Sequence, residues 1–425
     1  MAISTSVSSD VDGAIGILKL LFRSEFARRF SVRLWDGTSI PAAERAEFEF
    51  FVNTPFALRA AFTPPLDLNP GRAYVERYID IAGDAEAAVD AFATALERLP
   101  KAFLPLLAYR LARSPRPPSD SGTRQARLRG KLHTRARDAA AIGFHYDQPL
   151  AFYQTFLDPA MVYSCAYFDE GVASLEDAQR SKIDHIFRKI RLMPGDRLLD
   201  IGCGWGALVI AAAQRGARAL GITLSRMQYE EAMRRISDLG LQGRAEVQLR
   251  DYRELGKRVF DKIVSVGMVE HVGRQRLHRY FEAALGALRP GGLFLNHGIA
   301  DQTAKRRGIR ASGFIDSYVF PDGDLIAVSD SNAVAERVGF EVRDVENLRE
   351  HYARTLREWV ANLEARHDEV VRLTDERTYR IWRLYMAGSA QGFNRGRMGL
   401  FQTLFAKADA EGRGGVSATR RDLYR

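Results

Sequence analysis

Short apolar runs alternate with amphipathic segments over the second half of the chain. The apolar runs predict strands at residues 197–201, 219–223, 246–249, 261–266 and 293–297. Between them, apolar residues recur at helical spacing and predict helices at 174–189, 207–213, 225–239 and 278–288. This alternation is typical of a doubly wound, mostly parallel α/β sheet, which binds its ligands where strand ends meet their loops.

The first hundred residues follow a different pattern and predict a small α+β domain. The helix at 84–99 has the best-defined ends, because Asp84 can cap its first turn and Pro100 stops it. The other elements are a helix at 11–26, a hairpin around Asp36-Gly37, a strand then a helix within 47–62, and either a strand or a short helix at 74–81.

A basic segment separates these two patterns. Residues 110–138 contain nine Lys or Arg residues and two acids, with three prolines in the middle, which is typical of a linker or mobile arm. Its charge suits an anionic bilayer, where each basic residue near the surface contributes about 1 kcal/mol. It suits a solvated spacer equally well. Nucleic acid is a third partner to consider, but no aromatic residues interleave the cations as in single-strand binders.

Length, charge and cysteine content narrow the class of protein. A chain of 425 residues with 46% hydrophobic residues has material for two or three domains, and its net charge of +9 favours anionic partners. Cys165 and Cys203 are the only cysteines, which excludes a disulfide framework, and no zinc-ligand spacing indicates a metal. No signal-peptide pattern and no apolar run of about 18 residues occur. We therefore expect a cytoplasmic protein with peripheral membrane contact.

The stretch RLLDIGCGWG at 197–206 carries the first chemical signal. Gly202, Gly204 and Gly206 lie between a predicted strand and a predicted helix, where exposed amides can bind an electronegative group. The dinucleotide fingerprint reads G-x-G-x-x-G, whereas this stretch reads G-x-G-x-G after Asp200. That pattern resembles the first motif of class I S-adenosylmethionine (SAM) methyltransferases. The alternative is a glycine-tightened turn without a ligand.

Further motifs lie in order along the chain. They are HYD at 145–147, YSCAYF at 163–168, LLDIGCGWG at 198–206, GITLSRMQ at 221–228, DYR at 251–253, GMVEHVG at 267–273, FIDSYVFPDG at 314–323 and RLYMAGSAQGF at 383–393. Together they resemble the cyclopropane-fatty-acyl-phospholipid synthases and the related mycolic-acid cyclopropane synthases. The resemblance covers residues 145–406 well, and the N-terminal part matches loosely, as an accessory domain.

The resemblance implies a fold and a reaction. The fold is the seven-stranded, mostly parallel sheet of class I SAM methyltransferases, with a smaller N-terminal α+β domain. The reaction moves the SAM methyl group onto a cis double bond of an acyl chain in membrane phospholipid. A bound bicarbonate then removes a proton from the resulting carbocation, and a cyclopropane ring closes. SAM and bicarbonate are therefore the expected cofactors.

The resemblance also assigns residues to these ligands. Bicarbonate is expected at the backbones of Cys165 and Ile299 and at the side chains of Glu270, His297 and Tyr352. The expected SAM contacts, with the acid of the glycine motif, are Tyr163, Ser164, Asp200, Gly202, Gly204, Thr223, Leu224 and Gln228. Aromatic candidates for stabilising the cation are Tyr167, Phe168, Tyr318 and Phe320.

Taken alone, some of these residues have plainer explanations. His297 would be a hydrogen-bonded core histidine, Glu270 a solvated loop residue, and Cys165 a small buried hydrophobe rather than a nucleophile. Gly298 departs from the family, in which a larger residue is common at this position. Such departures bear on the acyl pocket rather than on the chemistry.

Domain boundaries follow from composition and motifs. We expect an accessory, lipid- or membrane-docking domain at 1–110, a basic linker at 111–140, the methyltransferase domain at 141–410 and a flexible basic tail at 411–425. The expected partners are an unsaturated acyl lipid and the anionic inner face of a membrane. No nucleic acid is expected, and a homodimer is left open.

Other activities remain open on the sequence alone. Loss of a different proton from the same cation gives a methylene- or methyl-branched chain, although branching relatives tend to lack the histidine found at His297. Another alkene, such as a terpenoid or polyketide, is a related alternative. A non-catalytic lipid-binding protein conflicts with the intact glycine motif. A nucleic-acid methyltransferase would carry an Asn-Pro-Pro-Tyr type motif after the fourth strand, where GMVE stands.

Overall fold

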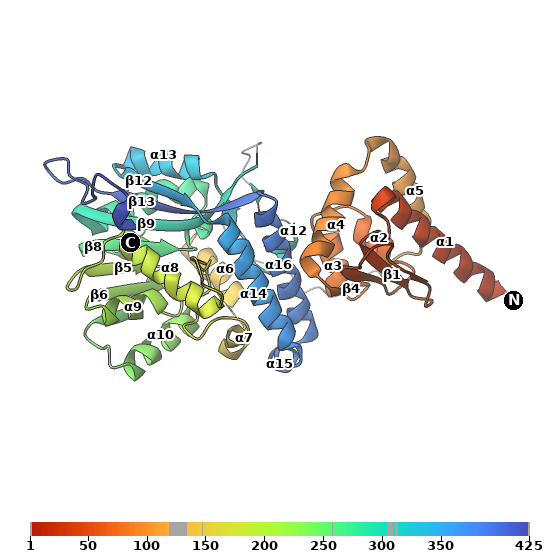
Figure 1. Ribbon diagram of the computed structural model, residues 1–425, viewed down its shortest axis with the longest axis horizontal. Coiled ribbons are helices and arrows are strands. Elements are labelled where there is room, and N and C mark those ends of the chain that lie inside the picture. The colour runs from red at the N-terminus through yellow and green to blue at the C-terminus, as the bar shows by residue number, and fades with distance from the viewer. Residues whose placement is uncertain are drawn as a thin grey trace. The chain divides into compact units, whose positions relative to one another are not determined.

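Figure 1 shows the elements of the computed structural model, which describes residues 2–118, 134–146, 148–256, 258–303, 309–310 and 313–423. The chain forms two compact units, each assembled from several segments. The smaller unit consists of Met1–Ala126, Ser312–Val319 and His367–Gln391. The larger unit consists of Arg127–Ala311, Phe320–Arg366 and Gly392–Arg425.

The larger unit is built around one sheet. Among the described residues, seven strands form it in the order β12-β13-β9-β8-β5-β6-β7. Their bounds are β5 Arg197–Ile201, β6 Arg218–Thr223, β7 Ala245–Leu249, β8 Phe260–Val266, β9 Leu288–Asp301, β12 Glu341–Asn347 and β13 Met398–Ala406. β13 is antiparallel to both neighbours, and the pairs from β9 to β7 are parallel. The predicted fold class is confirmed, and so are the five predicted strands.

Helices cover both faces of this sheet. They are α6 Arg135–Tyr146, α7 Leu150–Gln154, α8 Leu175–Lys189, α9 Ala207–Gln214, α10 Arg226–Asp238, α11 Leu277–Ala287, α13 Val328–Val338 and α14 Arg349–Ala365. Successive strand residues point to opposite faces. Leu198 therefore packs in one apolar core with residues of α8, α9 and α10, while Leu199 packs in another with residues of α11 and α13.

The smaller unit contains a second sheet, in the order β2-β1-β3-β4. Its strands are β1 Phe30–Leu34, β2 Ser39–Ile40, β3 Phe48–Val52 and β4 Ile79–Gly83, and its helices include α1 Ala2–Phe22, α2 Ala57–Phe62, α3 Asn69–Val75, α4 Ala85–Arg98, α5 Leu104–Arg113, α12 Gly313–Tyr318 and α15 His367–Leu373. The predicted hairpin is confirmed, and Asp84 caps α4 by accepting a hydrogen bond from Ala87 N (2.9 Å). The undecided segment at 74–81 holds the end of α3 and the start of β4.

A segment near the C-terminus belongs to the smaller unit, whereas the sequence predicts a continuous methyltransferase domain over 141–410. Helix α16 (Glu376–Asn394) carries two buried arginines that contact N-terminal residues. Arg380 donates to both carboxylate oxygens of Asp80 (3.0 Å each), and Arg383 donates to the carbonyl of Ile81 (3.0 Å). The partners are about 300 residues apart, so local composition carries no sign of this packing. The accessory role of the N-terminal domain stays a prediction.

The last described residues contact the rest of the larger unit at a few positions, although most residues in 411–423 are exposed, and the flexible basic tail stays a prediction. Arg191 donates to Gly415 O (2.7 Å) and pairs with Asp422 (2.5 Å), and Leu423 is buried. Within the predicted linker, residues 119–133 lie outside the described residues, as does Asp147 of the HYD motif. In the part of the chain that the structure describes, no helix is long and apolar enough to cross a membrane.

Candidate active site

The predicted glycine turn joins β5 to α9 in the larger unit. Gly202, Gly204 and Gly206 have φ angles of +83°, +53° and +84°, which L side chains rarely adopt. A Cβ atom at Gly202 would lie 3.0 Å from Met268 Cγ, and one at Gly206 would lie 3.1 Å from Ala232 Cβ. The turn therefore requires glycine for its backbone conformation and for its close packing.

A cavity beside this turn gathers all of the predicted SAM contacts. The residues lining it include Tyr163, Ser164, Asp200, Gly202, Gly204, Thr223, Leu224 and Gln228. Helix α6 adds Ile142 and Tyr146, and the segments that follow β7 and β8 add Asp251 and Met268. The cavity thus lies at the carboxyl ends of parallel strands, where a doubly wound sheet binds its ligands.

One wall of the cavity is polar but uncharged. Thr223 Oγ1 donates to Gln228 Oε1 (2.9 Å), and Ser225 Oγ accepts from Gln228 N at the start of α10 (3.3 Å). Tyr146 also hydrogen-bonds to Gln228, and burial raises the pKa of Tyr146 to about 12. These contacts fix Gln228 and Thr223 in position before any ligand binds.

Another wall carries two buried charges. Lys182 of α8 is 1% exposed and donates to Ser164 Oγ (2.9 Å). Asp200 is equally buried, and its Oδ1 has no hydrogen-bond partner among the described residues. Burial lowers the pKa of Lys182 to about 8 and raises that of Asp200 to about 7. This wall can therefore bind a charged group of a ligand.

A second, smaller pocket contains two of the predicted bicarbonate ligands, Glu270 and Ile299, with Asn296 and Ser331. Glu270 Oε1 accepts a hydrogen bond from the Ile299 amide (2.7 Å), so this amide orients Glu270 rather than being free for an anion. Glu270 Oε2 is buried and has no partner among the described residues. Burial raises the pKa of Glu270 to about 7, so its carboxyl group can change protonation state near neutral pH.

His297 lies on β9, directly opposite Gln402 of β13. It is 1% exposed, and burial lowers its pKa well below the usual value, so the ring is neutral. The side-chain amide nitrogen of Gln402 lies 3.2 Å from His297 Nδ1. Donation to Nδ1 leaves the ring proton on Nε2, which is buried without a partner in the described part of the chain. His297 thus offers one N–H donor.

A series of contacts connects the other two predicted bicarbonate ligands to this region. Leu400 pairs with Ile299 across the β13–β9 ladder, and its carbonyl accepts from the Leu348 amide (2.7 Å). The carbonyl of Leu348 in turn accepts from the Tyr352 amide (3.1 Å) and lies 3.9 Å from Cys165 Sγ. Burial raises the pKa of the Cys165 thiol, as expected for a structural cysteine rather than a nucleophile.

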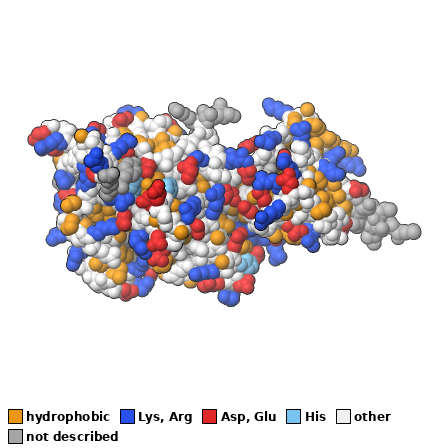
Figure 2. Space-filling model, in the orientation of Figure 1, with side chains coloured by type: hydrophobic (Ala, Val, Ile, Leu, Met, Phe, Trp, Pro, Cys, Tyr) orange, Lys and Arg blue, Asp and Glu red, His pale blue; other side chains and the backbone are white. Residues whose placement is uncertain are grey.

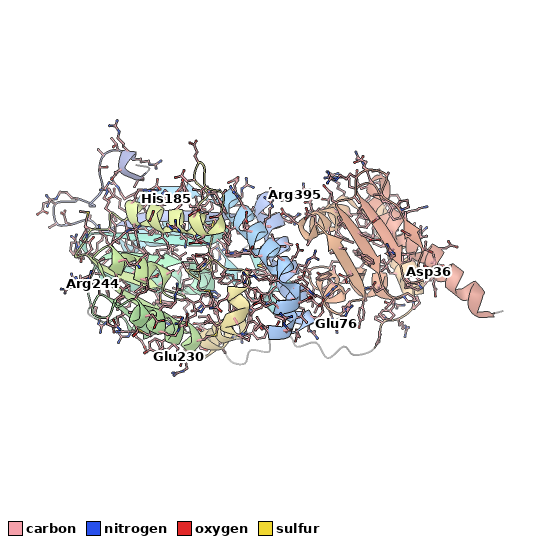
Figure 3. All side chains as sticks on the ribbon, turned by 60° about the horizontal axis from the view of Figure 1, so that its bottom comes forward. Asp36, Glu76, His185, Glu230, Arg244 and Arg395 are labelled. Carbon is pink, nitrogen blue, oxygen red and sulfur yellow. The ribbon has the colours of Figure 1, made fainter. Side chains whose placement is uncertain are left out.

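None of the four predicted aromatic residues lines either pocket, although Phe320 packs on His271, which lines the cofactor cavity. Tyr167 stacks on His185 of α8, which Figure 3 labels, with ring centroids 4.4 Å apart. Phe168 lies under an arginine guanidinium (3.9 Å), and Tyr318 belongs to the smaller unit. Phe320 packs on the ring of His145. Their part in stabilising a cation stays a prediction.

Sequence reasoning did not assign two residues that line the cavity, Tyr146 and Lys182. Tyr146 is the middle residue of the HYD motif. Lys182 is four residues from both Ala178 and Ile186, on the apolar side of α8. A lysine at such a position indicates a buried ion pair or a ligand site, because burying an ammonium group costs free energy unless an opposite charge or hydrogen bonds offset that cost.

Comparison with known proteins agrees with this geometry. The model of the mycolic acid cyclopropane synthetase family matches residues 133–403. A probable fatty acid methyltransferase of Pseudomonas putida is 40% identical over 398 residues, which covers 93% of this chain and 96% of that protein. Cyclopropane mycolic acid synthase 3 of Mycobacterium tuberculosis is 36% identical over 263 residues, which covers 59% of this chain and 91% of that protein.

Solved structures give the same result. The cyclopropane synthase MmaA2 from Mycobacterium tuberculosis superimposes with a TM-score of 0.60 at 32% identity, over 63% of this chain and 98% of that one. The mycolic acid cyclopropane synthase CmaA1, complexed with SAH and CTAB, also has a TM-score of 0.60, at 33% identity, over 63% of this chain and 97% of that one.

Proposed function

Because the chain belongs to the mycolic acid cyclopropane synthetase family and is a SAM-dependent methyltransferase, we propose that it converts cis double bonds of membrane phospholipid acyl chains into cyclopropanes. One arrangement carries the proposal. The eight predicted SAM contacts line one cavity, and Glu270 lies between Met268 and His271, which also line it. A buried group suited to proton transfer thus lies next to the cofactor cavity.

The cofactor supplies an electrophilic methyl group, and the protein orients the reactants. An alkene is a weak nucleophile, so the walls of the cavity must hold the double bond against the methyl group. A carbocation formed on the acyl chain reacts readily with water, and a closed apolar site excludes water. The buried Trp205 and the apolar side chains of Ile142 and Met268 line the cavity and can help to exclude water from it.

Ring closure requires removal of one proton from the transferred methyl group. Bicarbonate, the base that the resemblance implies, fits the polar atoms left without partners here. His297 Nε2–H can donate to one of its oxygens, and the Glu270 carboxylate can accept from its hydroxyl group. The Ile299 amide and Gln402 hold these two side chains in position. The direct roles proposed for Tyr352 and Cys165 rest on the resemblance.

The smaller unit offers a surface suited to an anionic bilayer. Helix α5 exposes Leu104 (49%), Leu106 (40%) and Tyr109 (59%) to solvent. Residues 98–119 contain five Lys or Arg residues and no acid. Figure 2 shows hydrophobic and cationic side chains together over α5. We propose that these apolar side chains enter the bilayer while the cations bind anionic headgroups.

This bilayer contact predicts a specific loss of vesicle binding. Replacing Leu104 and Leu106 by Glu should lower partitioning onto vesicles of anionic phospholipid by about tenfold per residue, because each leucine loses its apolar transfer free energy. The matched control is Leu239→Glu, a similarly exposed leucine (51%) on the larger unit. Wild-type binding should also weaken as salt rises to about 1 M. Equal loss in the control, or salt-independent binding, would contradict the proposed surface.

Product analysis tests the proposed reaction. Purified protein, SAM and vesicles of a cis-monounsaturated phospholipid are incubated, and acyl methyl esters are separated by gas chromatography with mass detection. The expected product co-elutes with a cyclopropane standard. A methylene-branched product of the same mass would retain the cofactor and overturn ring closure. Absence of any methylated acyl chain would overturn the phospholipid substrate.

A further inference from the structure

We propose that Lys182 and Ser164 form the site that binds the α-carboxylate in the methionine part of SAM. This inference rests on the proposed use of SAM and adds a residue to its binding site. Lys182 acts here as a binding residue, not as a group that reacts.

Two buried lysines of the same helix differ in their partners. Lys189 is fully buried and pairs with Glu346 (2.6 Å) and Asp344 (3.2 Å). Lys182 is equally buried, yet in the described part of the chain no carboxylate oxygen comes within 4.0 Å of its nitrogen. Its hydrogen bond goes to the hydroxyl of Ser164. A buried ammonium group with only a neutral partner is costly, unless a ligand supplies negative charge.

The nearby acids do not provide that charge at contact distance. Asp158 uses its two carboxylate oxygens to accept from Ala160 N and Val162 N (2.9 Å each). Asp200 interacts with Lys182 through space, and burial raises its pKa to about 7, so its negative charge is weakened at neutral pH. Both Lys182 and Asp200 line the cavity. The positive charge of Lys182 is therefore available to a negatively charged group of a ligand in the cavity.

The geometry at Ser164 suits a carboxylate in particular. Ser164 Oγ accepts from Lys182, so its own proton is available to donate. Lys182 and Ser164 together present donors on one wall of the cavity, and a carboxylate accepts hydrogen bonds at both oxygens. Another wall carries no charge, because Thr223 and Gln228 hydrogen-bond to each other there. The uncharged wall fits a nucleoside, and the charged wall fits the amino-acid part.

Binding of two ligands tests this assignment without the lipid reaction. S-adenosylhomocysteine carries the carboxylate, and S-adenosyl-3-thiopropylamine is the same molecule without it. By calorimetry, Lys182→Met should raise the Kd of S-adenosylhomocysteine by about 30-fold or more. The Kd of the decarboxylated ligand should change by less than about threefold, and Lys182→Arg should restore part of the preference.

Control variants separate binding from folding. Lys189→Met should lower the thermal midpoint, because it removes the buried lysine that pairs with both Glu346 and Asp344, but it should keep the wild-type ratio of the two Kd values. If Lys182→Met does not fold, Ser164→Ala should raise the Kd of S-adenosylhomocysteine selectively, by about tenfold.

Two results overturn the assignment. One is an equal effect of Lys182→Met or Ser164→Ala on both ligands, and the other is no effect on either. If the wild-type protein binds neither ligand, the use of SAM itself fails, which is a separate result from a loss without selectivity.

Discussion

The cofactor cavity and the neighbouring Glu270 pocket differ in the charge states of their side chains. At the cavity, Lys182 keeps a positive charge and donates to Ser164 before any ligand binds. At the pocket, burial raises the pKa of Glu270 to about 7, and His297, on the strand β9 whose neighbouring residues line the pocket, is neutral. Each of these two side chains is held by one hydrogen bond and keeps one polar atom without a partner among the described residues. In the proposed mechanism, the first region binds a charged group of the cofactor and the second takes part in proton transfer.

The largest expected effect is a loss of maximal rate on substitution of Glu270, with ligand affinity retained. Glu270→Gln should lower the maximal rate by about 10²-fold or more, because it removes the carboxylate that accepts the hydrogen bond from the proposed bicarbonate base. The variant keeps an oxygen for the hydrogen bond from Ile299 N, so local structure is preserved. The Kd of S-adenosylhomocysteine should stay within about twofold of wild type. A maximal rate within threefold of wild type would remove Glu270 from the proton path.

The pH dependence of the rate sharpens the same contrast. In the proposed mechanism the carboxylate form of Glu270 accepts the hydrogen bond from the bicarbonate hydroxyl, and burial raises the pKa of Glu270 to about 7. The groups beside it are the neutral phenol of Tyr146 and His271, whose pKa burial lowers to about 4. The maximal rate should therefore rise by roughly tenfold as pH increases from 6 to 8, because Glu270 is about one-tenth ionised at pH 6 and about nine-tenths ionised at pH 8. The residual rate of Glu270→Gln should not show this rise, and a persisting rise would assign it to another group.

Gly298 offers a smaller, steric way to disturb the proton-transfer region. A Cβ atom at this position would lie 2.3 Å from Val269 Cγ1, next to Glu270. This close approach accounts for glycine at this position. Gly298→Ala should displace Val269 and lower the maximal rate by about tenfold, with ligand affinity retained. Adding Val269→Ala should recover most of the rate, and a double variant no faster than the single one would reject the steric explanation.

The smallest effect comes from a residue that belongs to neither region. Asp84→Ala removes the N-cap of α4 in the smaller unit and should lower the free energy of unfolding by about 1 kcal/mol. Asp84→Asn keeps a capping oxygen and should lose much less. Denaturant unfolding followed by circular dichroism measures both variants. Ligand affinity and maximal rate should be unchanged. A loss in either would show that lower stability by itself changes the quantities used to compare the cofactor cavity with the Glu270 pocket.

Elements with strong local signals could be predicted from the sequence. The run at 197–201 coincides with β5, and Asp84 caps α4 as expected, because strand burial and helix capping depend on neighbouring residues. Six of the eight predicted SAM contacts lie together because parallel strands bring their carboxyl ends to one edge of the sheet, and Tyr163 and Ser164 join them from the segment before α8. The identities of these residues followed from the motif resemblance, and their proximity followed from the predicted parallel sheet.

Features that depend on long-range partners could not be predicted in this way. Arg380 bonds to Asp80 across 300 residues, so α16 could not be assigned to the smaller unit from composition. The amide of Ile299 was expected to hold bicarbonate, but it bonds to Glu270 because of the orientation that the glutamate side chain adopts. Lys182 was missed because motif matching does not ask whether a charged residue falls on the apolar face of a helix.

The most direct test of this division is the single-turnover rate measured as a function of SAM concentration, with cis-monounsaturated phospholipid vesicles, for Lys182→Met and Glu270→Gln. We predict that Lys182→Met raises the half-saturating SAM concentration by about 30-fold and lowers the maximal rate far less. Glu270→Gln should lower the maximal rate by about 10²-fold and leave the half-saturating concentration near the wild-type value. If both variants change the same parameter, the two regions do not divide the work of holding the cofactor and moving the proton.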